Sequence, residues 1–161
     1  MLYLIPAPVH RRLLRVAHAL RKRWWRLRRP RVDGCRVLAF DEAGHILLIR
    51  HSYGSGAWMP PGGGVKRSED PVLAAIRELA EETGLRLVEA RMVTQVVEHL
   101  HGARNHVHIV AGRADAEPQA DRREVLEARF HDPDALPDFM PDFIRDGLPD
   151  WIDLSRVSLS T

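Results

Sequence analysis

The 161-residue sequence contains a single cysteine, Cys35. One cysteine excludes an internal disulfide and a multi-cysteine zinc site, so we expect Cys35 to be a small buried residue. The chain also lacks the run of about 18 apolar residues that a transmembrane helix requires. Its first apolar stretch, residues 2–9, is short and contains two prolines, which is not typical of a secretory signal. These absences favour a cytoplasmic protein.

Acidic residues are missing from the first 32 positions, where ten basic residues occur. The whole chain has 24 basic and 22 acidic residues, so the remainder carries 14 bases against 22 acids. Between Val9 and Leu27, apolar residues recur at steps of three and four, which predicts an amphipathic helix. Pro30 and Asp33-Gly34 then favour a break in that helix. We therefore predict a basic helical arm over residues 1–32 and one larger domain over residues 33–161.

The larger part alternates between short apolar runs and polar turns. The runs 35–40 and 45–49 flank the turn residues 41–44, which predicts a β-hairpin. From residue 134 onward we expect partly helical structure, because three prolines limit any continuous run. Strands and helices together, in a chain of this length, predict a single domain of the α/β (α+β) class. Further strands are expected at residues 87–97, 106–112 and 125–130.

A glycine-rich loop precedes the clearest helix of the sequence. Residues 52–64 contain five of the eleven glycines and the pair Pro60-Pro61, so an irregular backbone is expected there. Ser68 is expected to cap the following helix, with Glu69 and Asp70 in its first turn. The helix should end at Gly84. Glycine-rich loops in such positions often carry function.

Three glutamates of this helix, Glu78, Glu81 and Glu82, are spaced so that their carboxylates point into one sector. Like charges at these spacings repel by about 0.2–0.5 kcal/mol per pair. Arg77 alone cannot neutralise three acids. The cluster is therefore either a solvated acidic face or a site for a hard divalent cation with oxygen ligands. Taken alone, it favours the solvated face.

The surrounding residues resemble the signature of the Nudix hydrolase family. That signature is Gly, five residues, Glu, seven residues, Arg-Glu, an apolar residue, any residue, Glu-Glu, any residue, Gly and an apolar residue. A pattern of about nine specified positions is specific when it lies in a loop followed by a helix. Segments 58–63, 127–130 and 134–137 also look like the family's usual flanks, so the resemblance covers about residues 35–137. Every fixed position of the signature is filled, by Gly63, Glu69, Arg77-Glu78-Leu79, Glu81-Glu82 and Gly84-Leu85.

The resemblance implies a Nudix fold, which is a mixed β-sheet sandwiched between α-helices. It also implies a metal-dependent hydrolase that cleaves a diphosphate linkage in a nucleoside diphosphate derivative or a nucleoside triphosphate. The implied cofactor is Mg²⁺ or Mn²⁺, which would neutralise the diphosphate and activate a water molecule. The substrate itself stays open, because specificity lies in loops outside the signature.

The resemblance also assigns roles to individual residues. The implied metal ligands are Glu78, Glu81, Glu82 and the carbonyl of Gly63. Arg77 is implied to orient the carboxylates, and Glu69 is implied to support these residues without binding the metal itself. The implied catalytic residues are Arg77, Glu81, Glu82 and Glu124. Glu82 and Glu124 are the two candidates for the general base, ahead of Asp121.

Several other residues allow two interpretations. Trp58 is either a base-stacking residue or a core aromatic, and the core is favoured. Arg50 and Tyr53 lie near the glycine loop and are candidate substrate contacts. Four histidines alternate in two segments around a short loop and would suit a zinc site, although histidines without a nearby cysteine are more often ordinary strand or loop residues. These four are His99, His101, His106 and His108.

The basic segment 9–31 suits three kinds of contact: the acidic body or a second copy of the chain, an anionic membrane surface, or nucleic acid. Docking or homodimer formation is preferred, because the body offers opposite charge at short range. An arginine-rich leader also fits a mitochondrial targeting segment. Two functions compete with small-nucleotide hydrolysis. A non-catalytic nucleotide-sensing module is disfavoured by the complete set of acids, and an RNA 5′-end hydrolase is supported only by the basic arm.

Overall fold

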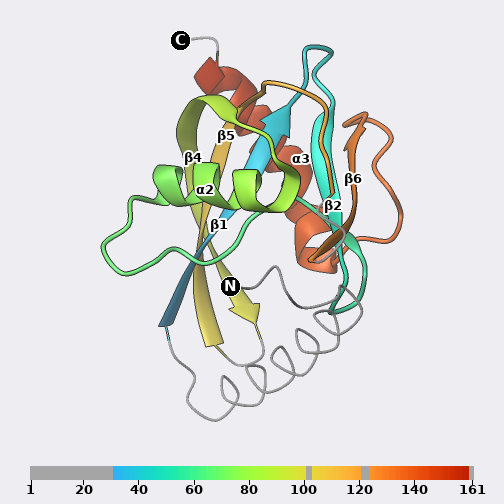
Figure 1. Cartoon of the computed structure of the whole chain (residues 1–161). Coiled ribbons are helices and arrows are strands. Elements are labelled where there is room, and N and C mark those ends of the chain that lie inside the picture. Colours follow the sequence, from blue (N-terminus) through green and yellow to red (C-terminus); the bar gives the residue numbers. More distant parts are fainter. Residues whose placement is uncertain (1–30, 101–102, 121–123, 160–161) are drawn as a thin grey trace, which may run out of the picture.

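The computed structural model describes residues 31–100, 103–120 and 124–159. The predicted arm therefore lies outside the described residues except for its last two positions, which begin the first strand. The described residues contain both strands and helices, with three strands before each helix (Figure 1), which confirms the predicted mixed class. The elements are β1 (Arg31–Phe40), β2 (Ile46–His51), β3 (Trp58–Met59), α2 (Pro71–Thr83), β4 (Leu87–Leu100), β5 (Ala103–Ala114), β6 (Val125–His131) and α3 (Asp142–Leu159).

The strands form one mixed sheet in the order β3-β2-β1-β5-β4, with β6 paired to β2. β1 and β5 run parallel along the whole of β1, and the other strand pairs are antiparallel. The predicted hairpin is confirmed, but β1 and β2 are in register only at Phe40 and Ile46. The two strands then diverge. The edge of β1 near Cys35 is thereby left to pair with another segment.

Alternate residues of β1 are buried on opposite faces of the sheet. Val37 and Ala39 belong to the apolar cluster under α2, whereas Leu38 and Phe40 belong to the cluster under α3. Figure 1 shows α2 across one face of the sheet and α3 across the other. This follows from the period of two in a strand, because a central strand covered on both sides must be apolar at every position. The predicted sandwich is confirmed.

Helix α2 begins two residues later than predicted. Asp70, and not Ser68, is its N-cap, and the Asp70 carboxylate accepts hydrogen bonds from the backbone N–H groups of Val72 and Leu73 at 2.8 and 3.2 Å. The prediction for Ser68 is wrong because Pro71 suits the first helical position, which fixes the cap one residue earlier. Glu69 therefore lies before the helix. The helix ends at Gly84 as predicted, with a φ of 72°.

Two other features of the fold differ from the sequence prediction. Helix α3 continues through Pro149, so the expectation that this proline interrupts the helix is wrong. Burial of Ile144 and Leu148 against the sheet offsets the hydrogen bond that a proline removes. The two-residue strand β3 lies within the predicted glycine loop and is too short for a pattern. Neither helix in the described ranges is long and apolar enough to span a membrane.

Candidate active site

Residues 61–65 run along the edge of β1 that β2 leaves open. The backbone N–H of Cys35 donates to the carbonyl of Gly63 at 2.9 Å, and Val37 N–H donates to the carbonyl of Pro61 at 2.8 Å. A Cβ on Gly62 would overlap the Cys35 carbonyl, and Gly62 has a φ of 153° that favours glycine. The predicted burial of Cys35 is confirmed. Burial also raises the pKa of its thiol to about 11, so the thiol stays neutral.

Two glutamates of α2 lie against residues 61–65, the loop that is hydrogen-bonded to β1. A Cβ on Gly63 would overlap the carboxylate of Glu78, so only glycine allows the two groups to meet. One turn further along the helix, Glu82 Oε2 accepts a hydrogen bond from Gly62 N–H at 3.0 Å. Glu82 is only 7% exposed. The loop and the helix therefore hold two carboxylates beside the same stretch of backbone.

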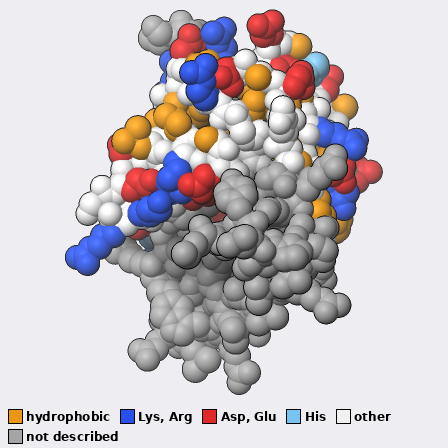
Figure 2. Space-filling view, in the orientation of Figure 1, with side chains coloured by type: hydrophobic (Ala, Val, Ile, Leu, Met, Phe, Trp, Pro, Cys, Tyr) orange, Lys and Arg blue, Asp and Glu red, His pale blue; other side chains and the backbone are white. Residues whose placement is uncertain are grey.

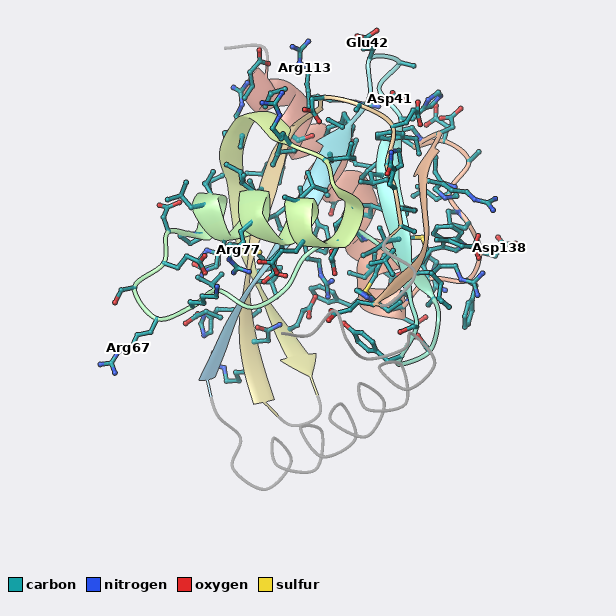
Figure 3. The ribbon with its side chains drawn as sticks, in the orientation of Figure 1. Asp41, Glu42, Arg67, Arg77, Arg113 and Asp138 are labelled. Carbon is teal, nitrogen blue, oxygen red and sulfur yellow. The ribbon has the colours of Figure 1, made fainter. Side chains whose placement is uncertain are left out.

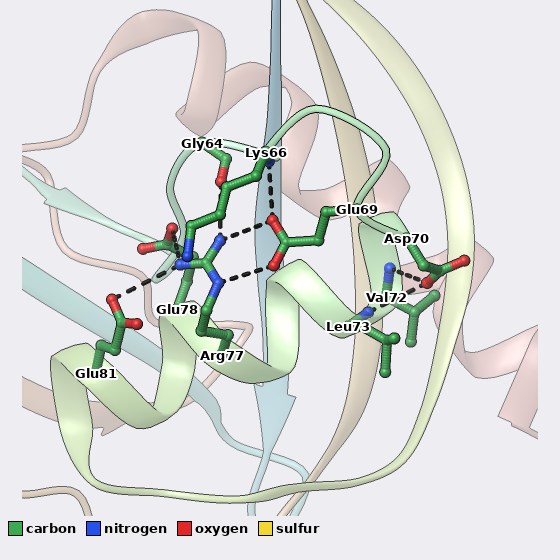
Figure 4. A network of polar contacts seen from close by, with 9 residues as sticks. All are labelled: Gly64, Lys66, Glu69, Asp70, Val72, Leu73, Arg77, Glu78 and Glu81. Atoms are coloured by element: carbon green, nitrogen blue, oxygen red, sulfur yellow. Dashed lines mark hydrogen bonds and ion pairs between the residues drawn. The ribbon is translucent and has the colours of Figure 1, made fainter.

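Arg77 connects α2 to the segment before it (Figure 4). Its Nε and Nη2 donate to the two carboxylate oxygens of Glu69 at 2.9 and 3.0 Å, which forms a bidentate pair. Nη2 also donates to the carbonyl of Gly64 at 3.1 Å. Hydrogen bonds from Arg77 lower the pKa of Glu69 to about 2, and the same contacts raise the pKa of Arg77. Both groups are therefore charged near neutral pH.

The same guanidinium also orients the acidic cluster. Nη1 of Arg77 donates to Glu78 Oε1 at 2.7 Å and lies 3.7 Å from Glu81 Oε2. Figure 3 places Arg77 beneath α2 near the loop, whereas Asp41 and Glu42 lie at the far end of the sheet. Acidic and basic side chains also lie side by side on this face of the molecule (Figure 2). The positive charge of Arg77 therefore balances part of the repulsion between the closely spaced glutamates.

A pocket of about 490 Å³ opens beside these carboxylates. Gly63, Glu78 and Glu82 line one part of it, and Tyr53 and Glu124 reach it from loops next to β2 and β6. These five predicted residues are therefore brought together. The side chain of Glu81 is 61% exposed and lies beside Arg77. Asp121 is outside the described residues.

Two predicted substrate contacts, Arg50 and Trp58, do not line this pocket. Arg50 donates to the carbonyl of Gly56 at 2.9 Å and to Glu127 Oε1 at 2.8 Å. Trp58 packs against the apolar cluster under α3 and meets the His131 ring edge-on, with the centroids 4.8 Å apart. The packing of Trp58 agrees with the core interpretation that the sequence favoured.

The oxygen atoms beside the pocket fit a hard divalent cation. Glu78 and Glu82 supply carboxylates, and the carbonyl of Gly63 keeps a second lone pair besides the one used by Cys35 N–H. No three acidic, histidine or cysteine side chains within the described ranges already surround one point. A bound ion would therefore need water or substrate oxygens as well, which is the usual behaviour of Mg²⁺. The zinc interpretation gains no support, since His101 lies outside the described residues.

Comparison with known proteins decides the family. The family model for the NUDIX domain matches residues 30–152, which is most of the chain. The chain belongs to the Nudix family. The membership that the Nudix signature at residues 63–85 predicted is thus confirmed.

Curated relatives of this Nudix chain match it over short segments. It is 42% identical over 69 residues to an RNA pyrophosphohydrolase of Teredinibacter turnerae, covering 42% of this chain and 39% of the relative. It is 49% identical over 49 residues to an RNA pyrophosphohydrolase of Rhizobium meliloti, covering 29% of each protein. The matches therefore span about two fifths or less of these relatives' length.

Solved structures match over a larger share of the Nudix domain. The MutT protein from Methanosarcina mazei Go1 has a TM-score of 0.69 at 25% identity, covering 77% of this chain and 94% of that one. The MutT Nudix hydrolase from Burkholderia pseudomallei has a TM-score of 0.66 at 25% identity, covering 74% of this chain and 97% of that one. The predicted Nudix fold is confirmed.

The Nudix pocket also contains residues that the sequence analysis missed. Arg36 of β1, Glu98 of β4 and Asn105 of β5 line it away from α2. The strand predicted to end at Val97 in fact continues to Leu100, so Glu98 is a strand residue. The available signal was an acid directly after the apolar pair Val96-Val97, and the shorter prediction placed it outside the strand.

His51 is a further residue near the site without a predicted role. Its Nε2 lies 3.7 Å from Glu82 Oε1, and its ring stacks on Tyr53 with the centroids 4.8 Å apart. His51 ends β2, and Arg50 separates it from a run of four buried apolar residues. Only the pairing of distant segments brings it to Glu82, so sequence spacing gave no signal for it.

Proposed function

We propose that this Nudix domain is a metal-dependent hydrolase that cleaves a diphosphate linkage in a nucleoside diphosphate derivative or a nucleoside triphosphate by attack of an activated water. One observation carries the proposal: Glu78 and Glu82 lie against the Gly62–Gly63 backbone at the pocket wall. Two carboxylates beside a pocket would repel an anionic substrate unless a cation lies between them. The arrangement therefore favours a substrate that binds together with a divalent ion.

Glu78, Glu82 and the carbonyl of Gly63 would hold Mg²⁺ or Mn²⁺, with Glu81 as a further ligand. When bound, such an ion neutralises charge on the diphosphate and lowers the pKa of its water. Arg77 holds Glu78 through its hydrogen bond, and Glu69 holds Arg77. The loop therefore positions the ligands before any substrate arrives, which reduces the cost of ordering them.

Glu82 and Glu124 are the candidates for the proton acceptor, since both line the pocket. An experiment can distinguish the role of metal ligand from the role of general base. A variant of a metal ligand binds Mn²⁺ more weakly, whereas a variant of the general base keeps its Mn²⁺ affinity and loses kcat. Electron paramagnetic resonance of Mn²⁺ bound to Glu82→Gln and Glu124→Gln measures the first property, and single-turnover kinetics measures the second.

The decisive test is a panel of nucleoside diphosphate derivatives and triphosphates with Mg²⁺ or Mn²⁺, in which phosphorus-containing products are followed. We expect cleavage of one substrate class, reduced by about a hundredfold or more in Glu82→Gln. Glu42→Gln is the matched control, because Glu42 is exposed at the far end of the sheet. If the folded chain binds Mn²⁺ and a nucleotide but cleaves nothing, the hydrolase proposal is wrong and the sensing module is favoured.

Hydrolysis of RNA 5′ ends is the second candidate function, and the names of the relatives favour it. It predicts a higher kcat/KM for 5′-triphosphorylated RNA than for a free nucleoside triphosphate of the same 5′ base. Because RNA binding through basic residues weakens with salt, the preference should shrink as salt is raised. Equal kcat/KM values for the two substrates would exclude this candidate.

Three predictions about the remainder of the chain accompany the proposal. They are the division into an arm (1–32) and a Nudix domain (33–161), contact of residues 9–31 with a second copy, an anionic membrane surface or nucleic acid, and a location in the cytoplasm. The ten basic residues before Asp33 support the second of these. Analytical ultracentrifugation of the full chain, alone and with anionic vesicles or RNA, separates the three kinds of contact.

A further inference from the structure

The wall of the pocket away from α2 contains a buried carboxylate with partners on two other strands. Glu98 is only 5% exposed. Its Oε1 accepts hydrogen bonds from Arg36 Nε and Nη2 at 3.0 and 2.8 Å. Its Oε2 accepts a longer one from Asn105 Nδ2 at 3.5 Å. Both oxygens of the carboxylate therefore have donors, as a buried charge requires.

These contacts fix the orientation of the Asn105 amide. The NH₂ group must face Glu98, since the reverse orientation would place two acceptor oxygens against each other. Oδ1 therefore lies on the other side of the amide, where it is buried and accepts no hydrogen bond from the part of the chain that the structure describes. Buried carbonyl oxygens usually have a donor, so this one needs an explanation.

The position of Asn105 supplies that explanation. Asn105 lines the same pocket as Glu78 and Glu82, and Gly34 lies beside it. A Cβ on Gly34 would be 3.3 Å from Asn105 Oδ1, so the missing side chain leaves room next to that oxygen. If the diphosphate of a substrate binds at Glu78 and Glu82, its nucleoside can occupy the remainder of the pocket. An N–H group on that nucleoside is the donor that Oδ1 lacks.

We propose that Asn105 determines substrate choice by accepting, through Oδ1, a hydrogen bond from an N–H group of the nucleobase. The proposal rests on the proposed function for the diphosphate end of the pocket. Glu98 and Arg36 are positioning residues, because they touch the Asn105 amide or its partner and hold it in one orientation. The substrate class is thereby narrowed to nucleotides whose base presents an amino or ring N–H donor to this wall.

The kinetic test uses pairs of nucleotides that differ by a single N–H donor. The pairs are ATP and purine riboside triphosphate, GTP and ITP, and GTP and its N1-methyl derivative. The wild type should prefer the donor-bearing member of at least one pair by about tenfold or more in kcat/KM, because a buried acceptor left without a partner is costly. Asn105→Leu should abolish that preference. Gln95→Leu, which removes an exposed amide from β4, is the matched control and should keep it.

Three outcomes of this test would overturn the proposal. The first is a wild-type enzyme that shows no preference within any pair, and the second is an Asn105→Leu variant that retains the wild-type preference. The third is a preference that depends on Asn105 but follows the 2′-hydroxyl in a comparison of ribo- and deoxyribonucleotides. Glu98→Gln gives a second variant, since a glutamine at position 98 also donates and lets the Asn105 amide turn. It should weaken the preference although Asn105 is intact.

A spectroscopic test does not depend on activity. Asn105 is the only asparagine of the chain, so labelling with [¹⁵N]asparagine gives one side-chain amide pair in a ¹H–¹⁵N spectrum. In at least one of the pairs, the donor-bearing nucleotide should shift this signal, whereas its partner and inorganic pyrophosphate should not. If pyrophosphate shifts it equally, the proposal is wrong. If the signal shifts as expected and no substrate is cleaved, the base contact stands and the hydrolase proposal fails.

Discussion

Helices α2 and α3 cover opposite faces of one sheet, but their charged side chains have different partners. On α3, Arg145 pairs with Asp142 at 2.6 Å and Arg156 pairs with Asp153 at 3.6 Å, and each partner lies three residues away on the same helix. On α2, Arg77 reaches Glu69 and the carbonyl of Gly64, which lie outside the helix. Exposed pairs within a helix contribute little to stability. Contacts that join a helix to a distant loop fix a geometry.

The difference shows which charges of the molecule build the site. The pairs on α3 keep an outer surface solvated, whereas the contacts of Arg77 hold the loop, the helix and Glu78 in one arrangement. Substitutions on the two helices should therefore differ in their effects on activity and stability. Changes around Arg77 should affect activity and stability together, and comparable changes on α3 should affect neither strongly.

Among the substitutions that test this comparison, Gly63→Ala should have the largest effect. The added Cβ would overlap the Glu78 carboxylate and displace it from the loop. A displacement of about 1 Å at a reacting group costs about a hundredfold in rate, so we expect kcat/KM to fall by about that factor. Gly64→Ala is the matched control, because no atom lies within 4 Å of a Cβ at that position. Steady-state kinetics on the substrate found in the panel measures both variants, and equal rates would contradict the role of Gly63.

Arg77→Ala should have the next largest effect. It removes at once the hydrogen bonds that Arg77 donates to Glu69, Glu78 and the carbonyl of Gly64, and it leaves the two partly buried carboxylates without the guanidinium that pairs with them. We expect a loss of about 1–3 kcal/mol in the free energy of unfolding, besides a lower kcat. Urea denaturation measures the first quantity. Arg145→Ala on α3 is the comparison and should leave the urea midpoint unchanged; if both variants lose the same stability, the contrast between the helices is wrong.

The sequence alone predicted those parts of the molecule whose residues lie close together along the chain. The spacing of Glu78 and Glu82, the glycines before the helix and the stop at Gly84 all follow from neighbours along the chain. The motif therefore predicted the side of the pocket next to α2. The apolar run 35–40 likewise predicted a strand, whereas its burial on both faces of the sheet became visible only in the structure.

The other wall of the pocket could not be predicted, because it depends on strand register. Glu98 and Asn105 are directly opposite each other in the β4–β5 pair, and Arg36 comes from β1 on the far side of β5. Arg36 is 62 residues away from Glu98 in the sequence. Glu98 and Asn105 are only seven residues apart, but nothing in the local pattern sets the register that places them opposite each other. The same limit applies to His51 beside Glu82. Nonlocal pairing places these groups, so a sequence motif names only one side of the site.

Asp70→Ala should have a smaller effect that is confined to stability. The variant loses the two hydrogen bonds from Val72 and Leu73 that cap α2. An N-cap aspartate typically contributes about 0.5–2 kcal/mol, so we expect a decrease of that size in urea denaturation. Ser68→Ala tests the corrected boundary of the helix and should cause no comparable loss. A larger effect at Ser68 than at Asp70 would restore the original sequence prediction.

The smallest expected effect is the pH dependence of the Glu69–Arg77 pair. Hydrogen bonding to Arg77 lowers the pKa of Glu69 from its ordinary 4.5 to about 2. A lowered pKa means that the carboxylate stabilises the folded state above pH 4.5 and loses this contribution as the pH falls towards 2. The Tm of Glu69→Gln should therefore lie below that of the wild type near neutral pH, and the difference should shrink through this range. High salt should reduce the difference, because the pair is partly accessible to solvent. A Tm difference that stays constant down to pH 2, or one that persists in the Arg77→Ala background, would show that the pair does not lower the pKa of Glu69 in solution.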